Sequence, residues 1–385
     1  RNSLSRPLPF QDKKNRHFHY FITPTMQSLL SKIDQYAAGT LTLDDQQDLR
    51  TAGNERFIIS SLMEEAIASS QIEGAATTRI EAKRMLRANE IPVNKDQKMI
   101  LNNYRTILAI REQWQSETLT AKLIRDIHKS MTSGTLHDEK DEGRYRSQKD
   151  DEAGLAVYDE EGTLLHAPPP WSEIDGMLHD LCKFANLEHK DEHFIHPVIK
   201  AVILHFWLAY VHPFVDGNGR TARAIFYWYL LRCKYWLFEY LPISRIILNA
   251  RGQYEKAFLY SEQDESDLNY FLMNQLISID KAIEDFKVYL KKKREEDHRS
   301  MGLLRDNPLL NRRQCSLLLH ALRNPNFVYT LKGHQNACGI VYETARKDLM
   351  NLVNMGFLEM HKEQKQFFFT PTRDLAAKIQ AAKKS

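Results

Sequence analysis

Two strongly apolar helices are predicted on either side of the turn His212-Pro-Phe-Val-Asp216-Gly-Asn-Gly-Arg220-Thr-Ala-Arg223. Residues 197–211, before the turn, are apolar on nearly every side, as expected of a buried central helix. The Gly-Asn-Gly run tolerates positive φ, so consecutive backbone N–H groups can point into one concavity. This concavity lies at the start of the next helix, whose unpaired N–H groups and dipole favour an anion. The turn therefore predicts a phosphate-binding site.

Four charged or titratable side chains of this turn support that prediction. Arg220 and Arg223 are three residues apart and can face one side of the first helical turn, where a bound anion would offset the unfavourable dipole. Asp216 is a candidate Mg²⁺ ligand, because Mg²⁺ takes one or two carboxylates together with substrate phosphates. His212, at the end of the buried helix, is a candidate general base. The plainer alternative is a capped turn with a buried core histidine, but the convergence of all four groups favours the phosphate site.

The composition limits the class of protein. The 385 residues carry a net charge of +3 and are 43% apolar, which predicts two or three globular domains rather than disorder. The four cysteines are far apart and form no Cys-x-x-Cys pair, which predicts a reduced, cytoplasmic setting without a structural zinc site. The longest apolar stretch, 201–215, contains two histidines and is shorter than a membrane span, so no membrane association is expected.

The near-neutral total hides an uneven charge distribution. Residues 301–385 contain 13 Lys and Arg against 6 Asp and Glu, so a basic unit is attached to a mildly acidic body. A charge run beginning at Lys291 indicates a solvated helix end or a linker, and we place a domain boundary near residue 300. The predicted organisation is a helical N-terminal region at 1–110, a helical core at 111–295 and a C-terminal unit at 300–385.

The body is predicted to be all-α with one β-hairpin. Residues up to about Pro24 indicate an irregular arm. The segment 55–73 places its apolar residues on one side of a helix, and Gly74 stands where a terminating glycine is expected. Helical periodicity is lost between 143 and 170, where residues 154–166 predict two short strands around a turn.

The basic C-terminal unit has its own pattern. Helices are predicted at 309–321, weakly near Gln335, and at 342–355, followed by two alternating strands over 357–370. This order resembles a winged helix-turn-helix. Such a unit could bind DNA with Arg346 and Lys347 on phosphates. A protein-docking role stays open, because Glu343 and Asp348 lie on the same helix.

The central turn also carries a family resemblance. Residues 212–223 match all eight specified positions of H-x-F-x-[DE]-G-N-G-R-x-x-R, the signature of the Fic (Fido) family of protein adenylyltransferases. Further matching pieces are Gly143-Arg-Tyr-Arg146, His166-Ala-Pro-Pro and His196-Pro-Val-Ile-Lys200, and the similarity covers roughly residues 50–290. The resemblance implies a Fic-type helical bundle with a small hairpin flap, followed here by the winged-helix unit.

The resemblance implies a role for each residue of the turn. His212 would deprotonate a Ser, Thr or Tyr hydroxyl of a target protein, or of the chain itself, and this hydroxyl would attack the α-phosphate of ATP. Asp216 would hold Mg²⁺, and Arg220 and Arg223 would neutralise the phosphate chain. The remaining nucleotide-site positions are Gly217, Asn218, Gly219, Thr221, Ala222 and Tyr254. For Tyr254 core packing is an equal alternative. His205, seven residues before His212 on the same predicted helix, could approach the face of His212, but a core position is favoured.

Two further parts of the implied site lie outside the turn. The hairpin residues Leu164, Leu165 and His166 would form a flap that clamps the target by strand-like pairing. Upstream, Ser69-Ser-Gln-Ile-Glu73-Gly74 matches the Fic inhibitory pattern [ST]-x-x-x-E-[GN]. By that similarity Glu73 would pair with Arg223 and exclude a productive ATP γ-phosphate.

Several functional alternatives stay open. Glu73 could be an ordinary surface residue, or it could orient water in a de-AMPylating or bifunctional enzyme. The protein could instead be a DNA-binding regulator whose helical body only senses a nucleotide. A third alternative is that the turn serves nucleotide hydrolysis or kinase-like transfer of the γ-phosphate. A homodimer is an open alternative for the oligomeric state.

Overall fold

The computed structural model describes residues 5–37, 55–88, 90–158, 162–188, 191–305, 309–363 and 366–381. These residues form two compact units that divide between Phe286 and Lys287. The division lies inside one long helix, α12 (Asn269–Arg305), which continues through the charge run at Lys291. In the described part of the chain, no helix is both long and apolar enough to cross a membrane.

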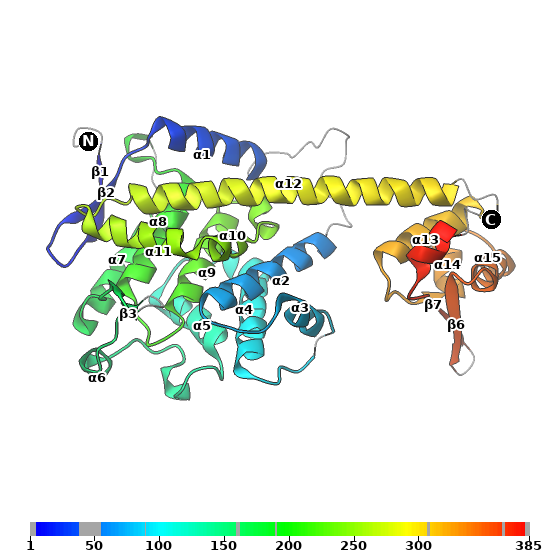
Figure 1. The fold of residues 1–385 in the computed structure, drawn as a ribbon, viewed down its shortest axis with the longest axis horizontal. Coiled ribbons are helices and arrows are strands. Elements are labelled where there is room, and N and C mark those ends of the chain that lie inside the picture. Colours follow the sequence, from blue (N-terminus) through cyan, green and yellow to red (C-terminus); the bar gives the residue numbers. More distant parts are fainter. Residues whose placement is uncertain are drawn as a thin grey trace. The chain divides into compact units, whose positions relative to one another are not determined.

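The first unit is built mainly from helices (Figure 1). Those before the central turn are α1 (Pro24–Ala37), α2 (Glu55–Ile72), α3 (Arg79–Ala88), α4 (Lys95–Glu112), α5 (Ala121–Thr132), α6 (Gln148–Glu152), α7 (Ile174–Asn186) and α8 (Pro197–Val211). Those after it are α9 (Asn218–Arg232), α10 (Ile243–Asn249), α11 (Arg251–Gln263) and the first part of α12. Short 3-10 turns lie at Trp114–Ser116, Glu139–Asp141, Trp171–Glu173, Asp191–His193 and Trp236–Glu239.

The helices α8 and α9 form the centre of this unit. Both are buried on nearly all sides, as the continuous apolar pattern of 197–211 predicted. Trp207 on α8 and Trp228 on α9 are among the largest fully buried side chains. Because the turn between these helices is anchored at both ends in the core, its backbone is held in a fixed position.

The prediction of an irregular arm before Pro24 is wrong. The strands β1 (Arg6–Gln11) and β2 (His17–Tyr20) pair antiparallel there. Leu8 and Phe10 of β1 alternate inward, and the Phe10 ring stacks on Trp207 at a centroid distance of 4.4 Å. The two prolines of β1 are exposed, and among the described strands β1 pairs only with β2, so its other edge tolerates residues without an N–H. Proline therefore did not exclude a strand here.

The hairpin predicted within 154–166 is present. Strands β3 (Val157–Tyr158) and β4 (Leu164–His166) pair antiparallel. Tyr158 and Leu164 are exposed, whereas His166 is buried. The hairpin therefore anchors one end and presents an open surface at the other.

The second unit contains the predicted helices and the predicted strand pair. Its elements after α12 are α13 (Arg312–Arg323), β5 (Tyr329–Thr330), α14 (Leu331–Cys338), α15 (Tyr342–Asn354), β6 (Leu358–Glu363), β7 (Gln366–Pro371) and α16 (Leu375–Ala381). The antiparallel sheet has the strand order β5-β7-β6. Leu318, Leu349, Leu352 and Phe369 lie in one apolar core. Strand β5 and helix α16 were not predicted.

Candidate active site

The turn between α8 and α9 is held by its own side chains. His212 takes the left-handed conformation at φ 48°, and Gly217 does so at φ 86°. The Asn218 side chain accepts a hydrogen bond from the Phe214 N–H (2.9 Å) and donates to the Phe214 carbonyl (2.7 Å). Asn218, predicted to cradle phosphate, therefore uses its amide to shape the loop and leaves backbone N–H groups for an anion.

His128 supports this loop from α5 and was missed in the sequence. Its Nδ1 accepts a hydrogen bond from the Gly143 N–H (3.0 Å), so Nε2 carries the proton and donates to the Asp216 carbonyl (2.8 Å). Its ring stacks on Phe214 at 3.6 Å, and burial lowers its pKa to about 4. A Cβ at Gly217 would approach the Thr132 methyl to 2.7 Å, so this position needs glycine for space as well as for its positive φ. His128 is one of several titratable residues on an amphipathic helix, so the sequence shows no signal of this role.

Glu73 and Arg223 form the predicted pair. The Arg223 Nη2 donates to Glu73 Oε1 (2.9 Å) and to the Ser69 carbonyl (2.9 Å), while its Nε donates to Ser69 Oγ (2.9 Å). Helix α2 ends at Ile72, and Gly74 follows at φ 92°. Burial alone would raise the pKa of Glu73, but the charges of Arg223 and Arg220 outweigh it and lower the pKa. Glu73 is therefore an anion held by two arginines.

The Glu73 carboxylate lies where the sequence predicted a bound anion. A Cβ added at Gly219, in the first turn of α9, would collide with Glu73 Oε1. Arg220 is buried, its Nη2 lies 3.7 Å from Asp216 Oδ1, and its Nε has no hydrogen-bond partner among the described residues. A buried donor of this kind is uncommon in folded proteins and fits a site that accepts further negative charge.

A cavity adjoins this anion site and collects residues from five elements. It is lined by Glu73 after α2, Leu165 and His166 of the hairpin, His212 after α8, Gly219 and Arg223 of α9, and Tyr254 of α11. Several predicted site residues lie outside this lining: Leu164 is exposed, Asp216 precedes α9, Arg220 is buried in the first turn of α9, and Thr221 and Ala222 are buried in the core. Thr221 Oγ1 donates to the Gly217 carbonyl (2.8 Å) and so steadies the turn.

Tyr254 both packs in the core and borders the cavity. Its hydroxyl lies 2.9 Å from His205 Nε2, and burial raises its pKa to about 12. His205 is itself fully buried, and burial lowers its pKa to about 3. The two alternatives that the sequence left open for Tyr254 are thus compatible, and His205 is a hydrogen-bonded core histidine.

His212 is neutral in this setting. Burial and the nearby His166 lower the pKa of His212 to about 3, while a hydrogen bond from its ring to the Ala209 carbonyl acts in the opposite direction. A neutral imidazole that donates through one nitrogen has the other nitrogen available as an acceptor. This is the protonation state that a general base requires.

A second buried carboxyl, Glu65, holds α2 against the core. Glu65 Oε2 lies 2.8 Å from the Tyr227 hydroxyl and 2.8 Å from the Ser244 N–H. The same hydroxyl lies 2.8 Å from the Leu241 carbonyl and accepts from the Ile243 N–H (3.0 Å). One phenolic proton cannot serve both oxygens, whereas a protonated Glu65 donating to Tyr227 satisfies every group. Burial raises the pKa of Glu65 in agreement with this assignment.

This assignment predicts a pH dependence of stability. In the unfolded chain the Glu65 carboxyl ionises above about pH 4.3, whereas in the folded chain it stays protonated to higher pH, so its contribution to the free energy of unfolding falls as pH rises. Glu65→Gln mimics the protonated carboxyl, and we expect its stability relative to wild type to increase from pH 5 toward pH 8. Urea unfolding followed by tryptophan fluorescence measures this in the first unit, where all five tryptophans lie.

The matched control for this experiment is Glu112→Gln, a change at an exposed position at the end of α4. Its stability should stay parallel to wild type at every pH. Parallel curves for Glu65→Gln and wild type would show that Glu65 is ionised in the folded chain.

Comparison with known proteins agrees with this geometry. Residues 118–230, which include His128, the hairpin and the turn, match the model of the Fic/DOC family. This part of the chain is therefore similar to a Fic domain. It is 34% identical over 118 residues to protein adenylyltransferase Fic of Nematostella vectensis, covering 31% of this chain and 24% of that protein. It is 37% identical over 70 residues to protein adenylyltransferase Fic of Drosophila melanogaster, covering 18% and 14%. The chain thus matches a quarter or less of the length of these relatives.

Solved structures show the same fold over a longer span. A Fic family protein from Desulfovibrio desulfuricans superimposes with a TM-score of 0.60 at 19% identity, covering 92% of this chain and 98% of that one. A segment of Fic-1 from C. elegans superimposes with a TM-score of 0.51 at 17% identity, covering 68% and 71%. The Fic fold therefore extends beyond the 113 residues of the family match.

Proposed function

We propose that this chain transfers AMP from ATP to a hydroxyl group of a protein and that Glu73 restrains the reaction. The observation that carries this proposal is the convergence of a neutral His212, the start of α9 and Arg223 on one cavity. A base alone would fit many reactions. A base beside a helix N-terminus with two buried arginines fits the polyanionic chain of a nucleoside triphosphate.

The proposed reaction has one chemical step. The hydroxyl of a target Ser, Thr or Tyr loses its proton to the free nitrogen of His212 while its oxygen attacks the α-phosphorus of ATP. The bond from the α-phosphorus to the bridging oxygen breaks, and pyrophosphate leaves with the electron pair. Arg220 and Arg223 stabilise the charge on the phosphates, and the exposed edge of the β3–β4 hairpin positions the target by main-chain pairing.

Asp216 fits a magnesium ion that arrives with the nucleotide. Its side chain is half exposed, so oxygen atoms remain available for an ion. Among the described residues there is no cluster of three His, Cys, Asp or Glu for a metal. One carboxylate plus substrate phosphates is a usual ligand set for Mg²⁺. The ion would supply charge neutralisation at the phosphates.

The restraint follows from the position of Glu73. Its carboxylate occupies the anion site beside the first turn of α9 and engages Arg223. A nucleotide whose γ-phosphate needs Arg223 must displace this carboxylate. The alternative in which Glu73 orients water for AMP removal predicts a different result, namely release of AMP from an already modified protein.

The position of the transferred label tests the proposal. With Mg²⁺ present, α-labelled ATP should label protein covalently and γ-labelled ATP should not. Transfer of the γ-label would indicate kinase-like use of the turn, and free labelled phosphate without protein labelling would indicate hydrolysis.

For the second unit we propose DNA binding by α15. The supporting observation is that Asp348, which counted against DNA in the sequence, is buried and accepts hydrogen bonds from Arg313 (2.7 Å) and Asn311 (2.8 Å). The charge of Asp348 is therefore buried and paired, whereas Arg346 and Lys347 are exposed on the same helix. The order of helices and strands supports a winged helix-turn-helix that presents α15 to a groove.

Filter binding of the full chain to duplex DNA across a salt series tests this role. We expect binding at low salt that weakens as salt rises, and the double variant Arg346→Ala/Lys347→Ala should reduce the salt slope by about 2, one for each lost phosphate contact. No binding at low salt would exclude DNA and favour a protein partner.

A further inference from the structure

The C-terminal end of α8 presents four carbonyls that no backbone N–H of the helix can reach. The His212 N–H bonds to the Leu208 carbonyl, and the carbonyls from Ala209 to His212 remain. The His212 ring bonds to the first of these, at Ala209. The other three are taken by two side chains from distant parts of the chain, Arg146 and His166.

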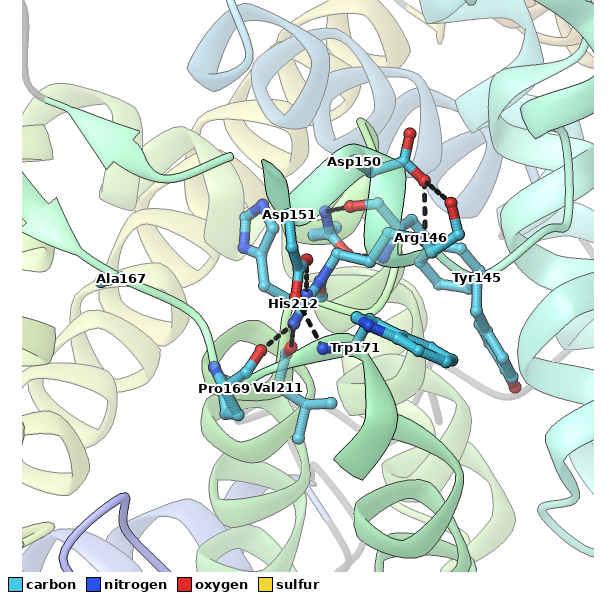
Figure 2. Close-up of polar contacts among 12 residues, drawn as sticks. Tyr145, Arg146, Asp150, Asp151, Ala167, Pro169, Trp171, Val211 and His212 are labelled. Carbon is cyan, nitrogen blue, oxygen red and sulfur yellow. Dashed lines mark hydrogen bonds and ion pairs between the residues drawn. The ribbon is translucent and has the colours of Figure 1, made fainter. Parts of the chain in front are cut away.

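Arg146 takes two of these carbonyls. Its Nε donates to the His212 carbonyl (2.8 Å) and its Nη2 to the Val211 carbonyl (3.3 Å), as Figure 2 shows. The same guanidinium donates to the Pro169 carbonyl and pairs with Asp151. Its side chain is 1% exposed. Arg146 is thus a buried cation placed directly on the backbone of His212.

His166 takes the remaining carbonyl. Its Nε2 lies 2.7 Å from the Tyr210 carbonyl, and its Nδ1 lies 2.9 Å from Glu262 Oε2 on α11. A carbonyl and a carboxylate only accept hydrogen bonds, so each ring nitrogen of His166 faces an acceptor. Its ring centroid lies 6.4 Å from that of His212.

We propose that Arg146 and His166 form a hydrogen-bonded cap on the C-terminal end of α8 that positions His212 and keeps its imidazole neutral. A helix C-terminus carries partial negative charge and ordinarily stabilises a protonated histidine. A general base must avoid that protonation. The Arg146 guanidinium places positive charge directly against this end, and the hydrogen bonds of the cap hold His212 in the left-handed conformation that few non-glycine residues adopt.

Other charges near His212 also affect whether its imidazole is protonated. Glu73 favours a charged imidazole, whereas Arg146 and His166 disfavour it. Asp151 pairs with Arg146 and Glu262 pairs with His166, so two carboxylates balance part of the positive charge of the cap. The hydrogen bonds from the cap to the α8 carbonyls do not involve Glu73, so they are present with and without the inhibitory contact.

The test separates charge from geometry with matched variants in a Glu73→Gly background. Arg146→Lys keeps the charge but lacks the planar guanidinium fork that reaches both carbonyls, whereas Arg146→Gln removes the charge as well. His166→Gln keeps one N–H donor without charge and provides a second test if Arg146 variants fold poorly. Arg144→Gln is the control, because Arg144 pairs with Asp141 and has no hydrogen bond to α8.

Histidine-ring NMR on the ¹⁵N-histidine-labelled full chain gives a readout that needs no AMP transfer. We expect a neutral His212 at pH 7. His212 should titrate at higher pH in Arg146→Gln and His166→Gln, and as in the parent in Arg146→Lys and Arg144→Gln. The same His212 titration in Arg146→Gln and the parent would overturn the cap.

Kinetics of AMP transfer give the second readout and rest on the proposed function. Arg146→Lys and Arg146→Gln should both lower kcat about 100-fold, the cost of a misplaced catalytic group, while KM for ATP stays unchanged. Equal kcat in Arg146→Lys and the parent would show that the hydrogen bonds of Arg146 do not position His212. Absence of transfer in the parent would refute the proposed function and leave the NMR result to decide the cap.

Discussion

Replacing Glu73 by glycine will raise incorporation of α-labelled AMP into protein by about 10- to 100-fold, within the range of coupling free energies typical between two sites of one protein. The wild-type carboxylate accepts from Arg223 at 2.9 Å and lies against Gly219, so it occupies the anion site. Its lowered pKa keeps it charged through the neutral range, so the restraint should not relax between pH 6 and 8. Initial rates of label incorporation at saturating Mg²⁺ measure the effect.

Glu112→Gly is the matched control for this variant. Glu112 also ends a helix, α4, but is exposed and away from the turn. It should label at the wild-type rate. Equal labelling by wild type and Glu73→Gly would reject the inhibitory assignment, and faster AMP removal by wild type from a modified protein would favour the water-orienting role.

Replacing His212 by alanine will abolish AMP transfer in both the wild-type and Glu73→Gly backgrounds. Loss of a positioned general base lowers rates by about 10²- to 10⁴-fold. The cavity residues that bind the nucleotide remain in place, so ATP affinity should persist. Rates from label incorporation together with ATP binding measured by calorimetry distinguish a lost base from a collapsed site.

His179→Ala provides the control, because His179 is exposed on α7. It should transfer AMP at the rate of its parent. Transfer by Glu73→Gly/His212→Ala at the rate of Glu73→Gly would show that another group accepts the proton.

The site was largely predictable because its parts are local in sequence. A helix–turn–helix with Gly217 and Gly219 fixes where the backbone N–H groups point, and Arg220 and Arg223 follow within one turn. The link to Glu73 was accessible only through the family pattern, because no local rule brings residues 150 positions apart together.

What the sequence did not predict depends on long-range packing. His128 and Glu65 each lie among other titratable residues of their helices, and their roles arise from carbonyls and hydroxyls contributed by α9, α10 and the central turn. Arg146 belongs to the motif at 143–146, but its partners are backbone carbonyls. Every residue has a carbonyl, so the sequence does not indicate which of them Arg146 contacts. The β1–β2 hairpin was missed because its prolines indicated a loop while the inward alternation of Leu8 and Phe10 was too short to outweigh them.

The most direct test of the proposed chemistry is the intact mass of the Glu73→Gly chain after incubation with ATP and Mg²⁺. We predict a mass increase of one or more AMP groups on the chain or on an added protein substrate, and none in Glu73→Gly/His212→Ala. A mass increase of phosphate groups, or an AMP adduct that persists without His212, would contradict AMP transfer by this site.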